Sequence, residues 1–316
     1  MNDLEKNIIK TIAFSDIFNY PLTPTEIYKW LFKPKKINGK YPSLFDIKKI
    51  LDTSNELRKK ISNIEGFYYL KGRRSIIYLR KQNNNLAEYK FSKTINLIKI
   101  YKFIPFVRMI AVCNSLAISN ANENSDIDLF IISKKNKIWL ARFFTIILVK
   151  FFDLRPKENN NEDTFCLSFF IDEDHLNIKN TMFSQNDIYF PHWIQQLIPI
   201  YNPDYLYEKF MKVNEWYKEY LPNGYNNSFV NEVKETYFSR FISTIFYHII
   251  CSIPILSYHL YGLLRKMQIL IIDHNLKSLV NLNTKVIVNN QMLKFHDNDR
   301  REIFYKKWKE RVNKII

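Results

Sequence analysis

Residues 106–133 read FVRMIAVCNSLAISNANENSDIDLFIIS, and this stretch decides the fold. Both ends are apolar and rich in β-branched residues, which predicts one strand at 106–113 and another at 126–132. A polar connection with a possible short helix joins them. Asp126 and Asp128 interrupt the second strand, one residue apart. Because residues i and i+2 of a strand share a face, we expect both carboxylates to point the same way.

Two carboxylates a few ångströms apart repel each other, so one of them holds a proton unless a cation neutralises the pair. Oxygen ligands suit Mg²⁺, which can orient an attacking hydroxyl and the α-phosphate of a nucleotide. The alternatives are arginines that cover the pair, or an unrelated α/β fold in which the aspartates only cap a strand. The pattern favours a magnesium site at Asp126 and Asp128.

The flanking sequence predicts an α/β unit. A basic amphipathic helix at 86–103 precedes the first strand, and KKNKIWLARFFTIILVKFFDL after the second strand has the length and periodicity of a helix. TFCLSFFID, at 164–172, then reads as a third strand. A helix between two strands usually makes them parallel, so we expect 126–132 and 164–172 to run in the same direction.

The arrangement resembles the nucleotidyltransferase superfamily, which includes DNA polymerase β and the kanamycin-type nucleotidyltransferases. Its pattern is an apolar strand, Gly-Ser, about ten residues, and Asp-x-Asp in a second apolar strand; this chain has Asn114-Ser115 and then Asp126-Ile127-Asp128. The resemblance implies that Ser115 and neighbouring amides hold the β,γ-phosphates of an NTP, and that Asp126 and Asp128 hold Mg²⁺. FSDIFNYPLT, SDIDLFII, FCLSFF and LKFHDNDRR also resemble segments of an uncharacterised bacterial and archaeal group with a winged helix before such a domain.

Two positions depart from that pattern. Asn114 replaces the expected glycine; asparagine tolerates positive φ best among the other residues, although its side chain could crowd the triphosphate. The superfamily also carries a third carboxylate on the next strand. If the strands are parallel, their starts are adjacent, which selects Asp163 over Asp172, with Glu162 as a substitute. Asp163 would then be the general base, a role that Ser168 in mid-strand does not suit.

Residues 1–72 are predicted to form a separate unit of three helices and a hairpin, which is the order of a winged helix. Thr23 with Glu26 and Ser43 with Asp46 form capping-box patterns, and the hairpin should turn near Glu65-Gly66. Basic residues at 43–74 are compatible with nucleic-acid binding, and the alternative is a winged helix that only packs against the next domain.

Composition narrows the function classes. The 316 residues carry a net charge of +16, which favours an anionic partner, although Lys, Asn and Ile are abundant throughout. None of the five glycines lies between 73 and 223, which excludes a P-loop or Rossmann fingerprint there. The three dispersed cysteines indicate buried thiols without a disulfide framework or zinc site. With no signal-peptide pattern in MNDLEKNIIK, we expect a cytoplasmic protein.

The C-terminal region, 184–316, is predicted to be mainly helical. Residues 241–264 are uncharged and flanked by arginines, but polar residues and Pro254 favour two buried helices over a membrane span, with membrane association as the alternative. His192 is expected to be a packing residue. The resemblance also implies that three residues of the last segment reach the active cleft: His296, Asp299 and Arg301.

The sequence therefore predicts an α/β (α+β) nucleotidyltransferase-like core with a mixed sheet at 73–183, between a winged helix and a helical region. The expected reaction is metal-dependent transfer of NMP from an NTP to an unknown hydroxyl acceptor, with release of pyrophosphate. The competing hypothesis is a catalytically degenerate nucleotide-binding regulator with a DNA-binding winged helix. The sequence does not indicate the oligomeric state.

Overall fold

The centre of the structure is a mixed six-stranded sheet, seen in a computed structural model that describes residues 1–156, 162–225, 232–272 and 274–316. The strand order is β6-β3-β4-β5-β8-β7. The strands are β3 (Val107–Val112), β4 (Ile127–Ser133), β5 (Phe165–Asp172), β6 (Ile198–Tyr201), β7 (Val286–Val288) and β8 (Met292–Phe295). β4 and β5 are parallel, as predicted, and the other neighbouring strands are antiparallel.

Three strands of this sheet come from the region predicted to be mainly helical. β6 pairs with β3, and β8 pairs with β5 and β7. The sequence prediction omitted them because each has only three or four residues, too few for a clear alternating pattern. Residues 184–316 therefore complete the sheet on both sides of the predicted core.

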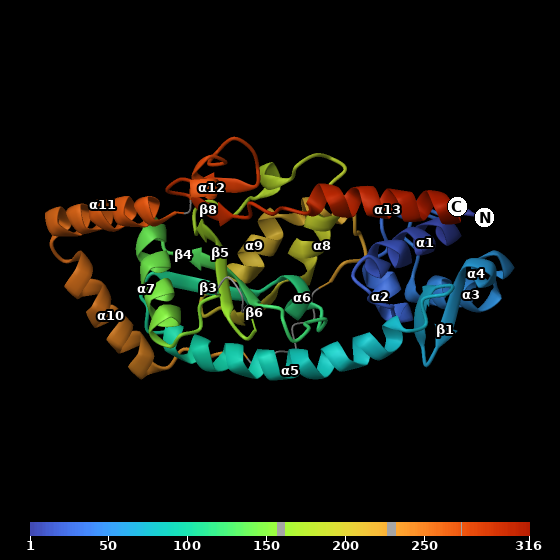
Figure 1. Cartoon of the computed structure of the whole chain (residues 1–316), viewed down its shortest axis with the longest axis horizontal. Helices are drawn as coiled ribbons and strands as arrows, with labels where there is room; N and C mark the ends of the chain where they lie inside the picture. Colours follow the sequence, from blue (N-terminus) through green and yellow to red (C-terminus); the bar gives the residue numbers. More distant parts are fainter. Residues whose placement is uncertain (157–161, 226–231, 273) are drawn as a thin grey trace.

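Helices cover both faces of the sheet (Figure 1). The helices that contribute to one core cluster include α5 (Ile76–Tyr101), the short α6 (Asn114–Ala117), α7 (Ile138–Phe151), α10 (Tyr237–Cys251) and α11 (Pro254–Ile271). The other cluster includes α8 (Tyr189–Gln196) and α9 (Leu206–Val213). Along β4, Ile127 and Leu129 belong to the first cluster, whereas Phe130 and Ile132 belong to the second. Since Asp128 has the parity of Phe130, its side chain leaves the sheet toward the α8 side.

The long helix α5 starts ten residues earlier than the predicted helix at 86–103, and it runs along one edge of the molecule from the N-terminal unit to α7 (Figure 1). Its first half contains the polar run 82–85, which lacks the apolar periodicity used for the prediction. Since three of these four residues are asparagines, which are weak helix formers, this half depends on tertiary contacts such as those of Ile76 and Ile77, which are buried against the hairpin.

The N-terminal unit has the predicted order of helices followed by a hairpin. Its elements are α1 (Asp3–Asp16), α2 (Pro24–Lys29), α3 (Leu44–Thr53), α4 (Asn55–Lys60), β1 (Ile61–Ile64) and β2 (Phe67–Leu70). The predicted third helix is divided in two because the Ser54 side chain caps α4. Both predicted capping boxes form, and Glu65 and Gly66 make the hairpin turn with positive φ.

This unit packs against the rest of the chain. The last helix, α13 (Arg301–Ile315), lies beside α1, and the Trp308 indole donates a hydrogen bond of 2.9 Å to the Lys10 carbonyl. The Trp30 indole donates to Gln195 Oε1 at 2.6 Å. Both chain termini lie at this end of the molecule (Figure 1).

Residues 241–264 form most of a helix pair, α10 and α11, which separates at Pro254 as predicted. The prediction that both helices are buried is wrong for their outer faces, where Ile249 and Tyr258 are 73% and 76% exposed. Among the described residues, no helix is both long and apolar enough to cross a membrane.

Candidate metal and nucleotide site

The turn after β3 has the left-handed backbone conformation expected where the superfamily pattern has glycine and this chain has Asn114. Asn114 has φ of 56°, so asparagine supports the left-handed geometry, as expected. The Tyr189 hydroxyl donates a hydrogen bond of 3.0 Å to Asn114 Oδ1, and the Asn114 side chain also hydrogen-bonds Asp128. Asn114 therefore links the turn to the aspartate pair. Ser115, the second predicted phosphate ligand, lines a cavity of about 260 Å³ together with Asn114 and residues of α1.

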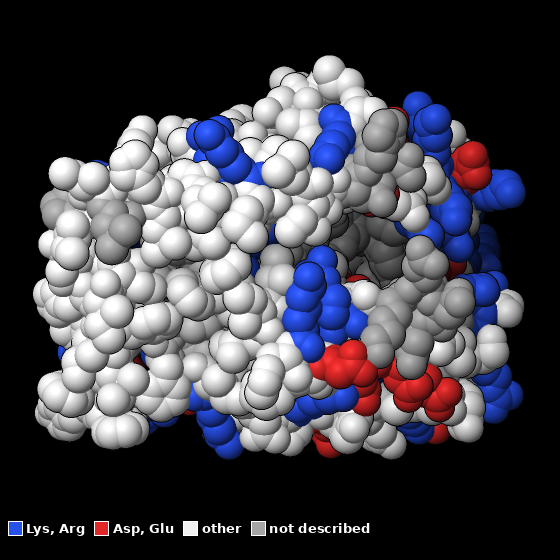
Figure 2. Space-filling view, turned by 60° about the vertical axis from the view of Figure 1, so that its left-hand side comes forward, with Lys and Arg blue, Asp and Glu red and all other residues white. Residues whose placement is uncertain are grey.

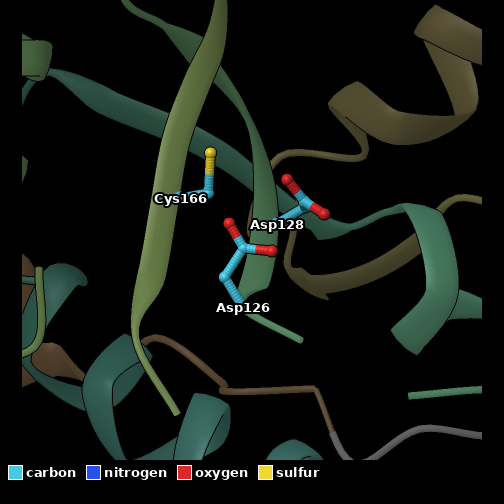
Figure 3. Close-up of side chains that lie close together, drawn as sticks. All are labelled: Asp126, Asp128 and Cys166. Atoms are coloured by element: carbon cyan, nitrogen blue, oxygen red, sulfur yellow. The ribbon is translucent and has the colours of Figure 1, made fainter. Parts of the chain in front are cut away.

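Asp126 and Asp128 extend into the same space, as their spacing predicts, although Asp126 lies just before β4 and the strand starts one residue later than predicted (Figure 3). One ligand atom from each of Asp126, Asp128 and Cys166 lies within 4.8 Å of the others. Within the described parts of the chain, neither carboxylate forms a salt bridge with Lys or Arg. The arrangement thus lacks the covering guanidinium groups of the structural alternative.

The pair has an unfavourable electrostatic environment for two negative charges. Burial raises the pKa of Asp126. Burial, followed by the negative charge of Asp126, raises the pKa of Asp128 to about 7, although hydrogen bonds from Asn114 and Cys166 oppose the change. A divalent cation between the two oxygens would remove this repulsion. The carboxylate oxygens fit Mg²⁺ or Mn²⁺, whereas the thiol is a softer ligand.

Cys166 is the residue of this cluster that the sequence prediction missed, since it treated the three cysteines only as buried thiols. All three are free, but only Cys113 is buried, so the prediction of buried thiols is wrong for the partly exposed Cys166 and Cys251. In the parallel pair of β4 and β5, however, Cys166 is the direct partner of Asp128. Burial first, then the two aspartates, raise the pKa of the thiol. Counting the register from the start of both strands would have identified this neighbour.

Asp163, the predicted third carboxylate, lies just before β5 and is not part of the cluster. Its oxygens pair with Lys90 Nζ at 3.0 Å and Lys93 Nζ at 3.3 Å. Burial opposes a lower pKa, but these two lysines hold the pKa of Asp163 below its usual value. Lys90 also donates hydrogen bonds to the carbonyls of Glu123 and Ser125. It therefore stabilises the loop that precedes Asp126.

A cleft of about 500 Å³ reaches the cluster at Asp126 and Cys166, on the α7 side of the sheet, whereas Asp128 does not line it. Ser168 and three basic residues of α7 and the following loop also line this cleft. These are Arg142, Lys150 and Arg155. Figure 2 shows a hollow on the face turned forward there, with both Lys or Arg and Asp or Glu around it. Its size is within the usual range for small-molecule sites, and its basic groups suit an anionic ligand.

Arg142 is the most unusual residue of this cleft. It donates to Gln268 Oε1 at 2.8 Å, but its buried Nε has no hydrogen-bond partner among the described residues. Burial, then the charge of Arg155, lowers the pKa of Arg142 to about 10. The sequence could have indicated a buried arginine here, because Arg142 is the one charged residue in the apolar run from 138 to 149. An anion in the cleft would compensate the buried charge.

The three C-terminal residues implied by the resemblance line a cavity of about 190 Å³ together with Asn114. Arg301 pairs with Asp187 at 2.8 Å and with Asp299 at 2.7 Å. His296 Nε2 lies 3.2 Å from Ser168 Oγ, while its buried Nδ1 has no partner within the described residues. Burial lowers the pKa of His296 to about 3, so the ring is neutral.

His192 has the packing role predicted for it. Its ring lies 4.3 Å from the ring of Phe14, centroid to centroid, and it is stacked at 6.4 Å on Phe32. Its Nδ1 donates to the Ile188 carbonyl at 2.8 Å, and the residue is 3% exposed. These contacts join α8 to the N-terminal unit, although His192 also lines the cavity that Ser115 faces.

Comparisons with family models, curated proteins and solved structures gave no significant match. The functional argument therefore depends on the geometry of the site and on the sequence pattern that led to it.

Proposed function

We propose that the chain is a divalent-metal-dependent nucleotidyltransferase. The observation that carries the proposal is the convergence of Asp126 and Asp128 without a salt bridge to arginine or lysine among the described residues. Burial, which raises the pKa of Asp126, outweighs the charge of Lys90, which lowers it. A cation held by the two carboxylates would neutralise the pair and offset the negative charge of a nucleotide triphosphate. The basic cleft beside Asp126 is consistent with an anionic substrate.

In this reaction, an acceptor hydroxyl oxygen forms a bond to the α-phosphorus of an NTP. The bond from that phosphorus to the bridging oxygen breaks, pyrophosphate leaves, and the hydroxyl proton passes to a base. Asn114 and Ser115 would contact the phosphates. Asp163 serves as the base only if its ion pairs with Lys90 and Lys93 open, since those pairs favour its unprotonated, poorly basic form.

The test measures pyrophosphate release with Mg²⁺ or Mn²⁺, each NTP in turn and a panel of sugar, antibiotic, nucleic-acid and protein hydroxyl acceptors. We expect release with one NTP, and loss of at least about a hundredfold in Asp128→Asn, because the second ligand oxygen becomes neutral. Asp163→Asn distinguishes a base from a structural residue: a base variant loses turnover but retains NTP binding. Absence of release under every condition would remove the enzyme proposal.

The regulator hypothesis is the second candidate, and three observations favour it. The cross-strand position beside Asp128 carries a thiol, and the nearest predicted carboxylate is paired with lysines. In the N-terminal unit, Lys48 and Lys49 on α3 are exposed. A regulator should bind DNA in a salt-dependent manner and should retain that binding in Asp128→Asn.

A further inference from the structure

The helix pair α10–α11 combines a packed inner face with an apolar outer face. Tyr247, Ile250, Leu260 and Tyr261 pack against the core cluster that includes α7. The two helices meet at one end of the molecule, away from the N-terminal unit (Figure 1). The connection between them, at Ser252 and Ile253, is therefore the outermost part of this end.

The outer face exposes an unusual number of large apolar side chains. Between residues 241 and 264 they are 41% to 76% exposed: Phe241, Ile245, Ile249, Ile253, Ile255, Tyr258 and Leu263. Figure 2 shows that the left part of this face has hardly any Lys, Arg, Asp or Glu. A surface with so many exposed apolar side chains and so few charges is typical of a site that contacts a protein or a membrane.

Charges flank the patch symmetrically. Arg240 precedes Ile253 by thirteen residues, and Arg265 follows it by twelve, with no Lys, Arg, Asp or Glu between them. At ~1.5 Å per residue, both lie roughly 18–20 Å along their helices from the connection. If the helices are inclined to the membrane, the connection would lie ~15 Å deeper than the two arginines, which is about half the hydrocarbon thickness of a bilayer. Both guanidinium groups could thus reach the head-group level while the connection is immersed.

The aromatic residues follow the same arrangement. Tyr237 and Phe238, next to Arg240, are 97% and 66% exposed. Aromatic rings and arginines concentrate where a membrane meets water. Arg240 pairs with Glu235, which lies just before α10, whereas Lys266 adds a further cation beside Arg265.

We propose that the α10–α11 pair inserts its connection and outer face into one leaflet of an anionic phospholipid membrane. Three observations select lipid as the occupant: the uncharged stretch of 24 residues, its matched arginines, and the net charge of +16. Insertion from one side requires no crossing helix. The binding energy comes from burial of the apolar side chains, and the cations add attraction to anionic head groups.

The experiment is flotation of the full chain with vesicles of phosphatidylcholine alone and with vesicles containing phosphatidylglycerol. We expect the protein to float with the anionic vesicles and to float less in high salt. Ile249→Asp combined with Ile255→Asp should reduce the floated fraction on the order of tenfold or more, because each carboxylate would enter the apolar layer. Phe45→Asp is the matched control, since Phe45 in the N-terminal unit is equally exposed at 73%, and it should float like the wild type.

Circular dichroism of the double variant shows whether it remains folded, which is expected for exposed positions. The proposal fails if the wild type does not float, or if the double variant and Phe45→Asp float equally. It also fails if light scattering finds a wild-type dimer that the double variant converts to a monomer while neither binds vesicles, because the patch then belongs to a second copy of the chain. None of these outcomes depends on nucleotidyl transfer.

Discussion

Asp128 and Cys166 are direct neighbours across the parallel pair of β4 and β5. The resemblance implies a third carboxylate on this strand, and the structure has a thiol beside the pair instead. Asp163 is close in sequence but is occupied by two lysines. The site in this chain therefore has two carboxylates and a thiol, whereas the resemblance implies three carboxylates.

Cys166→Asp should strengthen the binding of Mg²⁺ or Mn²⁺. A third carboxylate in the cluster adds a hard oxygen ligand, and we expect the dissociation constant to fall by about tenfold. Isothermal titration calorimetry measures the change. Cys166→Ser is the control, because it has similar size but no charge and should remain near the wild type. Equal affinities for the aspartate and serine variants would show that position 166 does not face the cation.

Asn114→Gly and Asn114→Ala should differ in stability. Both variants lose the contacts with Tyr189 and Asp128, but only glycine adopts φ of 56° without strain. We expect the glycine variant to be more stable than the alanine variant by about 1 kcal/mol in urea denaturation. An alanine variant that equals or exceeds glycine would contradict the left-handed turn.

His192 should make the fold sensitive to acid. Burial lowers the pKa of His192 to about 4, from the ordinary 6.5. Between these values the unfolded chain takes up a proton that the folded chain does not, so stability is complete above pH 6.5 and falls as the pH decreases toward 4.

His192→Phe should reduce the stability difference between pH 7 and pH 5, by up to about 2 kcal/mol, because the aromatic packing remains without a titrating group. Thermal melts at the two pH values measure it. If the variant loses as much stability in acid as the wild type, His192 is not the group responsible.

The sequence alone predicted those features of the fold and site that depend on one local rule. The spacing of Asp126 and Asp128 on one strand predicted their common direction, and the capping boxes predicted the starts of α2 and α3. The helix between β4 and β5 predicted their parallel pairing. In each case, the information lies within a few residues of the feature or in one connection.

The remaining features depend on contacts between distant segments. The partners of Asp163 come from α5, far earlier in the chain, and no local pattern indicates that Lys90 and Lys93 reach it. The short strands β6 and β8 form because the edges of the sheet require partners. The exposed face of α10–α11 has the composition of a buried helix, so hydropathy alone predicted burial.

The most direct measurement of the central claim is a Mn²⁺ titration of the metal-free chain, followed by electron paramagnetic resonance. We expect saturable binding that is lost in Asp126→Asn and in Asp128→Asn but retained in Asp163→Asn, because only the first two residues direct their carboxylates at the shared space. Binding of Mn²⁺ that is unchanged in both Asp126→Asn and Asp128→Asn, or absent in the wild type even with an NTP present, would contradict the claim.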